Sequence, residues 1–192
     1  MKKKFLIIVA LFSFGFANAQ KYEVKVNPLG LFYGKPDLFA EYIVNDNFGV
    51  EISLGFAFGK SVGPTFSFNE NSSERPDQSG FGAKIVGKYY FSPDQGADGW
   101  YGGIYFRQES LNLTYSSAFS ANNYKTSIFA GGVEFGKKWV FDTGVLIDIS
   151  MGTGRAFSEK REFVNRPTDN SFVGFELGYD FTCKFAVGYR FN

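Results

Sequence analysis

The sequence has 192 residues, which is the size of one domain, and its formal net charge of +1 does not suggest a nucleic-acid partner. It contains no histidine and one cysteine, which excludes Ser–His–Asp and Cys–His catalysis, imidazole metal sites and an internal disulfide. Phenylalanine and glycine are abundant instead, with 25 and 23 residues. We therefore expect no bound cofactor or metal.

Residues 1–19 have the pattern of a secretory signal peptide. Three lysines at positions 2–4 precede the short apolar segment Phe5–Phe16, and the small residues Ala17 and Ala19 frame a cleavage site. The apolar segment is shorter than the roughly 20 residues that a membrane-spanning helix needs. We expect cleavage after Ala19, export across the inner membrane, and a single mature domain over residues 20–192.

Beyond residue 20 the sequence alternates between apolar and polar residues, a period typical of β-strands with two different faces. The pattern is clearest over Phe175–Phe191, where apolar residues occupy the odd positions. Over Tyr22–Tyr33 the alternation slips near Pro28, which predicts a β-bulge because proline cannot donate a ladder hydrogen bond. The eight predicted strands are Tyr22–Tyr33, Leu38–Val44, Phe48–Phe58, Phe81–Phe91, Trp100–Arg107, Phe129–Phe141, Val145–Met151 and Phe175–Phe191.

The predicted connections between these strands alternate in kind. Three are turns of modest length, and three others are long and polar, namely Lys60–Ser79, Leu111–Asn123 and Arg155–Ser171. The first connection, Gly34–Asp37, is short. Taking the strands in order places the long loops at one end and the modest turns and both termini at the other. This arrangement is typical of an antiparallel up-and-down barrel.

Alternation alone allows a barrel with an apolar lumen in water or one with an apolar outer face in lipid. Four features favour the apolar outer face. The polar face is rich in glycine, its charges nearly balance, and aromatic residues gather at the strand ends. An eleven-residue strand such as Phe48–Phe58, tilted by about 40°, also spans roughly 28 Å. We therefore predict an all-β, eight-stranded antiparallel up-and-down transmembrane β-barrel.

Charged residues of the polar face are expected to pair inside the lumen, because buried charges need partners. The predicted ion-pair network comprises Glu51, Lys84, Lys88, Arg107, Glu134, Lys138, Asp148, Glu176, Asp180, Lys184 and Arg190. Glu134 and Asp148 have the chemistry for acid–base catalysis, but pairing in the lumen is the favoured interpretation, and no catalytic residue is predicted. On the apolar face, Lys137 falls close to the turn end, where charge costs little.

Three segments resemble the small eight-stranded outer-membrane barrels of Bacteroidetes, which are grouped with OmpA-, OmpX- and OmpW-like barrels and are mostly uncharacterised. They are Lys25–Leu29, Glu41–Tyr42 and Ala186–Phe191, and the resemblance covers nearly all of residues 20–192. The chain end also resembles the signal read by the barrel-assembly machinery, with Lys184, Tyr189 and Phe191 at its polar and aromatic positions. Ala186 stands where glycine is usual, and Asn192 follows the last aromatic residue. The resemblance implies an outer-membrane location, with membrane lipid and the assembly machinery as partners.

Three functions are compatible with this sequence. The first is an outer-membrane barrel with a packed polar lumen, acting in envelope structure or surface interaction through its extracellular loops. The alternatives are a narrow solute channel and a soluble periplasmic barrel that binds an apolar ligand. Lipid A deacylases and outer-membrane proteases resemble this shape but rely on histidine, so we do not expect an enzyme.

Overall fold

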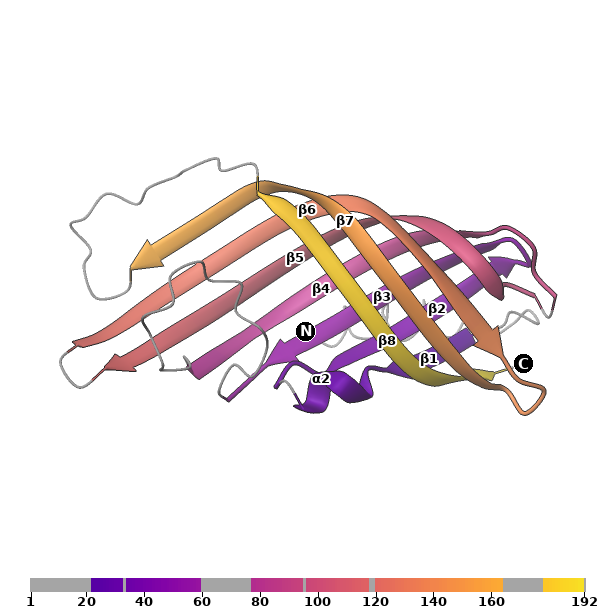
Figure 1. Cartoon of the computed structure of the whole chain (residues 1–192), viewed down its shortest axis with the longest axis horizontal. Helices are drawn as coiled ribbons and strands as arrows, with labels where there is room; N and C mark the ends of the chain where they lie inside the picture. Colours follow the sequence, from indigo (N-terminus) through magenta and orange to yellow (C-terminus); the bar gives the residue numbers. More distant parts are fainter. Residues whose placement is uncertain are drawn as a thin grey trace, which may run out of the picture.

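The computed structural model describes residues 22–32, 34–59, 77–94, 96–117, 120–163 and 178–191. Within them, eight antiparallel strands follow one another around a closed barrel in the order β1 to β8 (Figure 1). β1 pairs with β8 as well as with β2, which closes the ring. The predicted eight-stranded up-and-down β-barrel is therefore confirmed.

The described elements connect at two ends of the barrel. The strands are β1 (Tyr22–Val26), β2 (Asp37–Asn45), β3 (Phe48–Ala57), β4 (Asp77–Tyr90), β5 (Gly99–Ser117), β6 (Ser120–Val140), β7 (Val145–Phe163) and β8 (Tyr179–Phe191). A short helix, α2 (Pro28–Phe32), precedes β2. We call the end that carries the β2–β3, β4–β5 and β6–β7 connections the turn end, and the opposite end the loop end. The turn end lies on the right in Figure 1.

The segment Tyr22–Tyr33 does not form one strand with a β-bulge, as predicted. β1 stops before Asn27, and helix α2 follows. The Asn27 side-chain oxygen accepts a hydrogen bond of 3.1 Å from the backbone N–H of Gly30, which caps the helix. Pro28 occupies the first helical position, where a backbone N–H is not needed. The slip in the alternation thus marks the start of a capped helix.

Four strands reach farther toward the loop end than predicted. The sequence predicts a long loop over Leu111–Asn123, but β5 and β6 continue to pair as far as Ser117 and Ser120. β7 also continues through Arg155 to Phe163, within another predicted loop, and β4 begins inside the predicted loop Lys60–Ser79. The extensions of β4, β6 and β7 lack a regular apolar–polar alternation, and in β5 the apolar residues change from even to odd positions, so that Leu111 faces the cavity. Residue periodicity therefore does not predict these parts of the strands, although their backbone hydrogen-bond ladder continues.

Other predictions concern residues that the structure does not describe. The signal peptide with its cleavage residues Ala17 and Ala19, most of Lys60–Ser79, and Glu176 all lie outside the described ranges. Among the residues that are described, no helix has the length and apolar character needed to cross a membrane.

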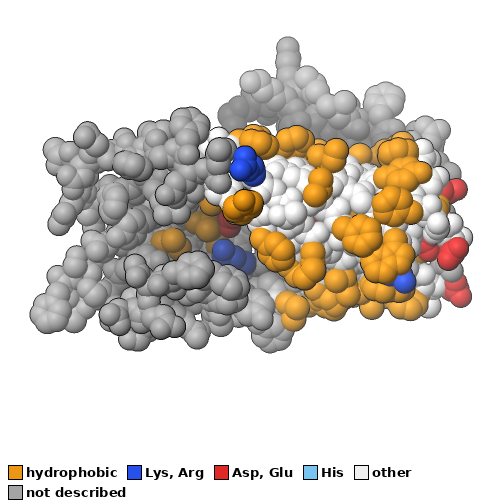
Figure 2. Space-filling model, turned by 45° about the horizontal axis from the view of Figure 1, so that its top comes forward, with side chains coloured by type: hydrophobic (Ala, Val, Ile, Leu, Met, Phe, Trp, Pro, Cys, Tyr) orange, Lys and Arg blue, Asp and Glu red, His pale blue; other side chains and the backbone are white. Residues whose placement is uncertain are grey.

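The described strands direct polar side chains into the lumen and apolar side chains outward. In β3, Val50, Ile52 and Leu54 are exposed, whereas Glu51 and Ser53 between them are buried. Figure 2 shows exposed apolar side chains spread over the face of the barrel wall in view. We call this outer face the apolar belt; its members include Val24, Leu38, Val50, Ile52, Leu54, Ile85, Ile104, Phe106, Val133, Phe135, Ile149, Met151 and Phe181.

Glycines on the inner wall make room for tyrosine rings. A Cβ atom added to Gly136 would lie 2.6 Å from both the Tyr101 ring and the carbonyl oxygen of Ile149. One added to Gly154 would lie 2.7 Å from the Tyr105 hydroxyl and closer still to the carbonyl oxygen of Gly131. Both tyrosines are fully buried. Because an eight-stranded lumen is only wide enough for side chains to fill, each large ring faces a position without a side chain.

The substitution Gly136→Val should lower the free energy of unfolding by roughly 1–3 kcal/mol, because the added atoms press against the Tyr101 ring and the neighbouring strand's backbone at Ile149. Gly87→Val provides a matched control, since Gly87 is exposed and nothing lies within 4 Å of an added Cβ there. The control should change stability by less than about 0.5 kcal/mol. Denaturant unfolding in detergent micelles, followed by circular dichroism, measures both. Equal effects of the two substitutions would contradict the tight inner packing.

Candidate functional site

The interior of the described barrel is largely ionic, with a few buried apolar side chains such as Ile43, Val86 and Leu146 among the charges. Every strand from β1 to β8 contributes at least one charged side chain to it, and most of these side chains are fully buried. The charges form a central cluster, a turn-end cluster and a loop-end cluster. The central cluster comprises Lys25, Glu41, Glu51, Lys88, Asp148 and Lys184; the turn-end cluster comprises Glu23, Lys138 and Arg190; the loop-end cluster comprises Arg107, Glu109 and Asp180.

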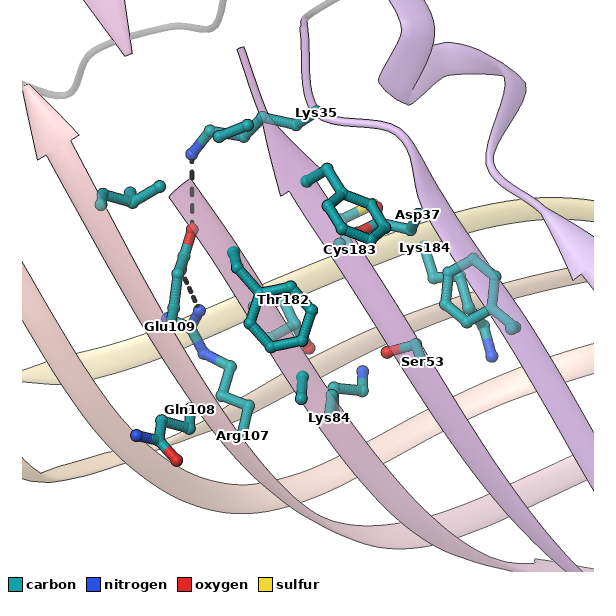
Figure 3. A pocket seen from close by; sticks show the side chains of 18 of the residues that line it. Lys35, Asp37, Ser53, Lys84, Arg107, Gln108, Glu109, Thr182, Cys183 and Lys184 are labelled. Atoms are coloured by element: carbon teal, nitrogen blue, oxygen red, sulfur yellow. Dashed lines mark hydrogen bonds and ion pairs between the residues drawn. The ribbon is translucent and has the colours of Figure 1, made fainter. Parts of the chain in front are cut away.

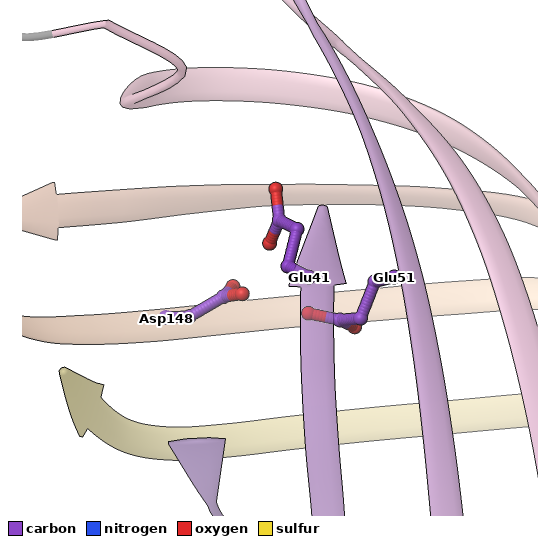
Figure 4. A group of neighbouring side chains, drawn as sticks. All are labelled: Glu41, Glu51 and Asp148. Carbon is purple, nitrogen blue, oxygen red and sulfur yellow. The ribbon is translucent and has the colours of Figure 1, made fainter. Parts of the chain in front are cut away.

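Three carboxylates meet in the central cluster. Glu41 from β2, Glu51 from β3 and Asp148 from β7 point toward one another, and one oxygen of each lies within 4.8 Å of the others (Figure 4). Glu41 and Glu51 are direct cross-strand partners in the β2–β3 register. Like charges in that position repel, and buried carboxylates are costly without cations. The cluster therefore depends on the basic residues around it.

Two fully buried lysines each contact all three carboxylates. Lys25 Nζ lies 2.5 Å from Glu41 Oε2 and 2.8 Å from Asp148 Oδ2. It also lies 2.5 Å from Glu51 Oε2. Lys88 Nζ lies 2.7 Å from Glu51 Oε2 and 3.0 Å from Asp148 Oδ2, and its distance to Glu41 Oε2 is 2.9 Å. The two ammonium groups thus bridge strands that are far apart in the sequence.

A third lysine completes the central cluster. Lys184 Nζ lies 2.9 Å from Glu51 Oε1 and 2.9 Å from Asp148 Oδ2. Carboxylate oxygens are ligands that hard cations such as Ca²⁺ accept, but here they already accept hydrogen bonds from ammonium groups. A metal ion at this position would have to displace a lysine. The geometry is that of an ion-pair core.

The turn-end cluster closes the lumen on that side. Lys138 Nζ lies 2.8 Å from Glu23 Oε2 and 3.1 Å from Glu41 Oε1. Arg190 Nη2 lies 2.6 Å from Glu23 Oε1 and donates a hydrogen bond of 3.1 Å to the carbonyl oxygen of Ala97. Ala97, in the β4–β5 connection, is fully buried and has a positive φ of 44°, which is uncommon for a residue with a side chain. Ala97 and Asp98 of this connection are therefore buried in the turn end of the barrel and fill it.

The loop-end cluster is less deeply buried. The Arg107 guanidinium forms a two-point contact with Asp180, with Nη2 2.5 Å from Oδ1 and Nε 2.9 Å from Oδ2. Its Nη1 lies 2.6 Å from Glu109 Oε2. The Tyr105 hydroxyl donates a further hydrogen bond of 2.7 Å to Asp180. Arg107 thus holds β5 against β8 while part of its side chain stays accessible.

A cavity of about 360 Å³ lies on the loop-end side of the central cluster (Figure 3). Small residues on β3 and β4, including Ser53, Gly55 and Gly82, line one side and leave the space open. Lys84 contributes to the lining and forms an ion pair with Glu134. The charged residues that line the cavity are Lys35, Asp37, Lys84, Arg107, Glu109 and Lys184. Charged groups of both signs thus share the lining with apolar side chains such as Phe39 and Leu111.

Three buried tyrosines belong to the interior although the predicted network omits them. Tyr90 donates a hydrogen bond of 2.5 Å to Glu41 Oε1, and Tyr101 donates one of 2.7 Å to Asp148 Oδ1. Tyr105 donates its hydrogen bond to Asp180 of the loop-end cluster. The sequence pattern that could have identified these tyrosines is the presence of aromatic residues at inward positions of β4 and β5. The phenol rings fill space while their hydroxyl groups satisfy carboxylates.

The described members of the predicted network face the lumen. They are Glu51, Lys84, Lys88, Arg107, Glu134, Lys138, Asp148, Asp180, Lys184 and Arg190. Glu176 lies outside the described residues. The structure adds Glu23, Lys25, Glu41 and Glu109 as ion-pair partners. The predicted set is therefore smaller than the group of charges that the barrel brings together.

The predicted assembly signal divides between the two faces of β8. Lys184 is buried in the central cluster, whereas Tyr189 and Phe191 are exposed on the outer face. Ala186, which stands in place of the usual glycine, is fully buried. Recognition of these residues by the assembly machinery stays a prediction.

The substitution Lys88→Met should lower the free energy of unfolding by roughly 3–5 kcal/mol, because it leaves three buried carboxylates with less compensating charge. Lys35→Met is the matched control: Lys35 is 44% exposed, and its Nζ lies 3.6 Å from Glu109 Oε1. The control should cost less than about 1 kcal/mol. Denaturant titration of folded protein in micelles provides the comparison. A loss at Lys88 no larger than that at Lys35 would contradict the central role of the buried pairs.

Comparisons with known proteins add a family and a structural neighbour. No curated protein matches the sequence. The chain is similar to the crystal structure of a major outer membrane protein from Thermus thermophilus, with a TM-score of 0.45 and 15% sequence identity. The similarity covers 91% of this chain and 100% of that chain. A family model described as protein of unknown function (DUF3575) matches residues 5–187, and the chain belongs to that family.

Proposed function

We propose that the protein is an integral outer-membrane β-barrel that acts in envelope structure or in surface contact through its loop end, without enzymatic activity. One observation carries this proposal, namely the inverted placement of charged and apolar side chains. Lys25 and Glu51 are fully buried, whereas Ile104 and Met151 are 63% and 59% exposed. In water this arrangement would bury ions and expose hydrocarbon. In a lipid bilayer the same arrangement places each group favourably.

Aromatic residues at the turn-end margin of the apolar belt also support a membrane location. Trp100, Trp139, Tyr189 and Phe191 lie near the strand ends and are exposed. Such side chains favour the interface between hydrocarbon and headgroups. The closed pairing of β1 with β8 meets the further requirement that backbone groups in lipid have internal partners. Insertion by the barrel-assembly machinery is part of the same proposal.

The alternative of a soluble carrier for apolar ligands finds little support in the described residues. An apolar ligand needs a cavity lined mainly by hydrophobic side chains. The cavity here carries Lys35, Lys84, Arg107 and Lys184 in its lining. The apolar side chains that such a carrier would need inside the barrel lie on its outer face.

The interior also argues against a channel. The central cluster, with the rings of Tyr90 and Tyr101, fills the middle of the lumen, and the β4–β5 connection closes the turn end. The cavity lies on the loop-end side of these obstructions. A cavity that is closed on the inside favours contact with molecules at the loop end over passage through the barrel.

Membrane fractionation combined with protease shaving of intact cells tests the proposal directly. The protein should be found with the outer membrane and should require detergent for release, and cleavage should be confined to loop-end segments. Unboiled protein should migrate differently from boiled protein on gels, because the closed barrel resists unfolding. Release of folded protein without detergent would overturn the membrane assignment.

We predict that the purified protein gives no reproducible single-channel conductance in planar bilayers. The fully buried ion pairs of the central cluster obstruct the middle of the described lumen, and an ion would have to break them to pass. A large open porin inserted under the same conditions serves as the positive control. Robust, uniform current steps from the wild-type barrel would show that the core is not sealed.

Placing an arginine in the apolar belt should be costly. Ile52→Arg and Val133→Arg should each lower the free energy of unfolding in bilayers by about 2–4 kcal/mol, because both residues face outward near the middle of the belt. Asn112→Arg is the matched control, on the exposed outer face of β5 beyond Phe106, the last outward apolar residue of that strand. Reversible unfolding in lipid vesicles measures all three. If both belt variants behave like the control, the belt does not meet hydrocarbon.

A further inference from the structure

The outer face of the barrel carries one unusual group of side chains near its turn end. Lys137 Nζ lies 5.1 Å from the centre of the Trp100 ring and 5.1 Å from the centre of the Trp139 ring. These are the only two tryptophans in the chain. The register explains the grouping, because Trp100 is the direct cross-strand partner of Lys137, and Trp139 lies two residues farther along β6 on the same face.

The ammonium group of Lys137 has cation–π contacts but no anionic partner among the residues that the structure describes. This distinguishes it from the lumen lysines, whose Nζ atoms lie against carboxylates. Two aromatic rings attract a cation but leave its N–H donors without hydrogen-bond acceptors. The group can therefore accept an anion from outside the protein.

The position of Lys137 indicates which anion is available. It lies three residues before the end of β6, at the margin of the apolar belt. The Trp100 ring stacks on Phe135 at a centroid distance of 5.3 Å, so that apolar surface continues from the lysine into the belt. Figure 2 shows basic side chains at both margins of the belt and acidic side chains beyond it at the turn end. A ligand with a negatively charged head and an apolar tail would match the cationic lysine and the apolar surface that adjoins it.

We propose that Lys137, Trp100 and Trp139 form a binding site for the phosphate of an anionic phospholipid in the leaflet at the turn end. The phosphate accepts hydrogen bonds from Lys137, the tryptophan rings flank the headgroup, and the acyl chain follows Phe135 along the belt. This site rests on the proposed function, since it requires the barrel to span a bilayer. A soluble anion would lack the apolar contact and would meet a single lysine.

Intrinsic fluorescence tests the site, because both tryptophans of the chain belong to it. The barrel is reconstituted in phosphatidylcholine vesicles that contain a small fraction of brominated lipid, either phosphatidylglycerol or phosphatidylcholine. Bromine quenches tryptophan on contact, so the two quenching curves give the relative association constant of the two headgroups. We expect a preference of about fivefold for phosphatidylglycerol, the size expected for one lysine near an anionic headgroup.

Two variants separate the site from general attraction to the membrane. Lys137→Gln should reduce the preference to about one, since the cation is removed while both tryptophans remain. Arg155→Gln is the matched control, because Arg155 is also an exposed basic residue on the outer face but lies toward the loop end. That variant should keep the preference of the wild type. Retention of the preference in Lys137→Gln would overturn the proposed site.

The remaining outcomes distinguish failure of the site from failure of the membrane assignment. Equal quenching by both brominated lipids in the wild type would refute the phosphate site but leave the barrel in the membrane. Absence of quenching by either lipid would refute the membrane assignment and the site with it. Inorganic phosphate added to the detergent-solubilised barrel should leave the fluorescence unchanged. A saturable change would assign the site to soluble anions instead.

Discussion

The ion pairs between Lys88 and the carboxylates of Glu41, Glu51 and Asp148 join strands that are far apart in the sequence. They also fix the register, because a slip of one residue in β4 would turn Lys88 outward and Tyr89 inward. A carboxylate left without its lysine inside the lumen costs several kcal/mol, far more than an exposed pair contributes. The closed ring, the alternation of faces and the filled lumen thus all depend on one requirement, that buried charges meet opposite charges.

Period-two alternation is sufficient to predict the barrel because the inner and outer faces differ in chemistry wherever the inner face meets the ionic core. The same reasoning places Glu51, Lys88 and Asp148 on the inner face. It cannot predict which charges touch, since Lys25 and Asp148 are brought together by closure of the ring and not by spacing along the chain. It also fails where the alternation fades, as in β6 and β7, or changes parity, as in β5, so the predicted strands end before the outer parts of these three strands.

The two ends of the described barrel differ in how they are filled. At the turn end, Arg190 holds the carbonyl group of Ala97, and the backbone of the β4–β5 connection enters the lumen. At the other end, Gly55 and Gly82 face a cavity, and the charges that line it are partly accessible. This asymmetry follows from residue size: Tyr90 fills inward space near the turn end, whereas glycines leave it open near the loop end. Any contact with small molecules inside the wall therefore belongs to the loop-end side.

Basic residues on the two faces of the wall meet the same physical requirement in different ways. Lys138 points inward and finds Glu23 and Glu41 within 3.1 Å. Lys137, its neighbour in β6, points outward between two indole rings. Successive residues of a strand face opposite sides, so β6 carries one lysine whose charge is neutralised by the protein and one whose charge faces the surroundings of the barrel. In a bilayer those surroundings include lipid phosphate. A phosphate can therefore pair with the outward lysine in the same way that carboxylates pair with the inward one.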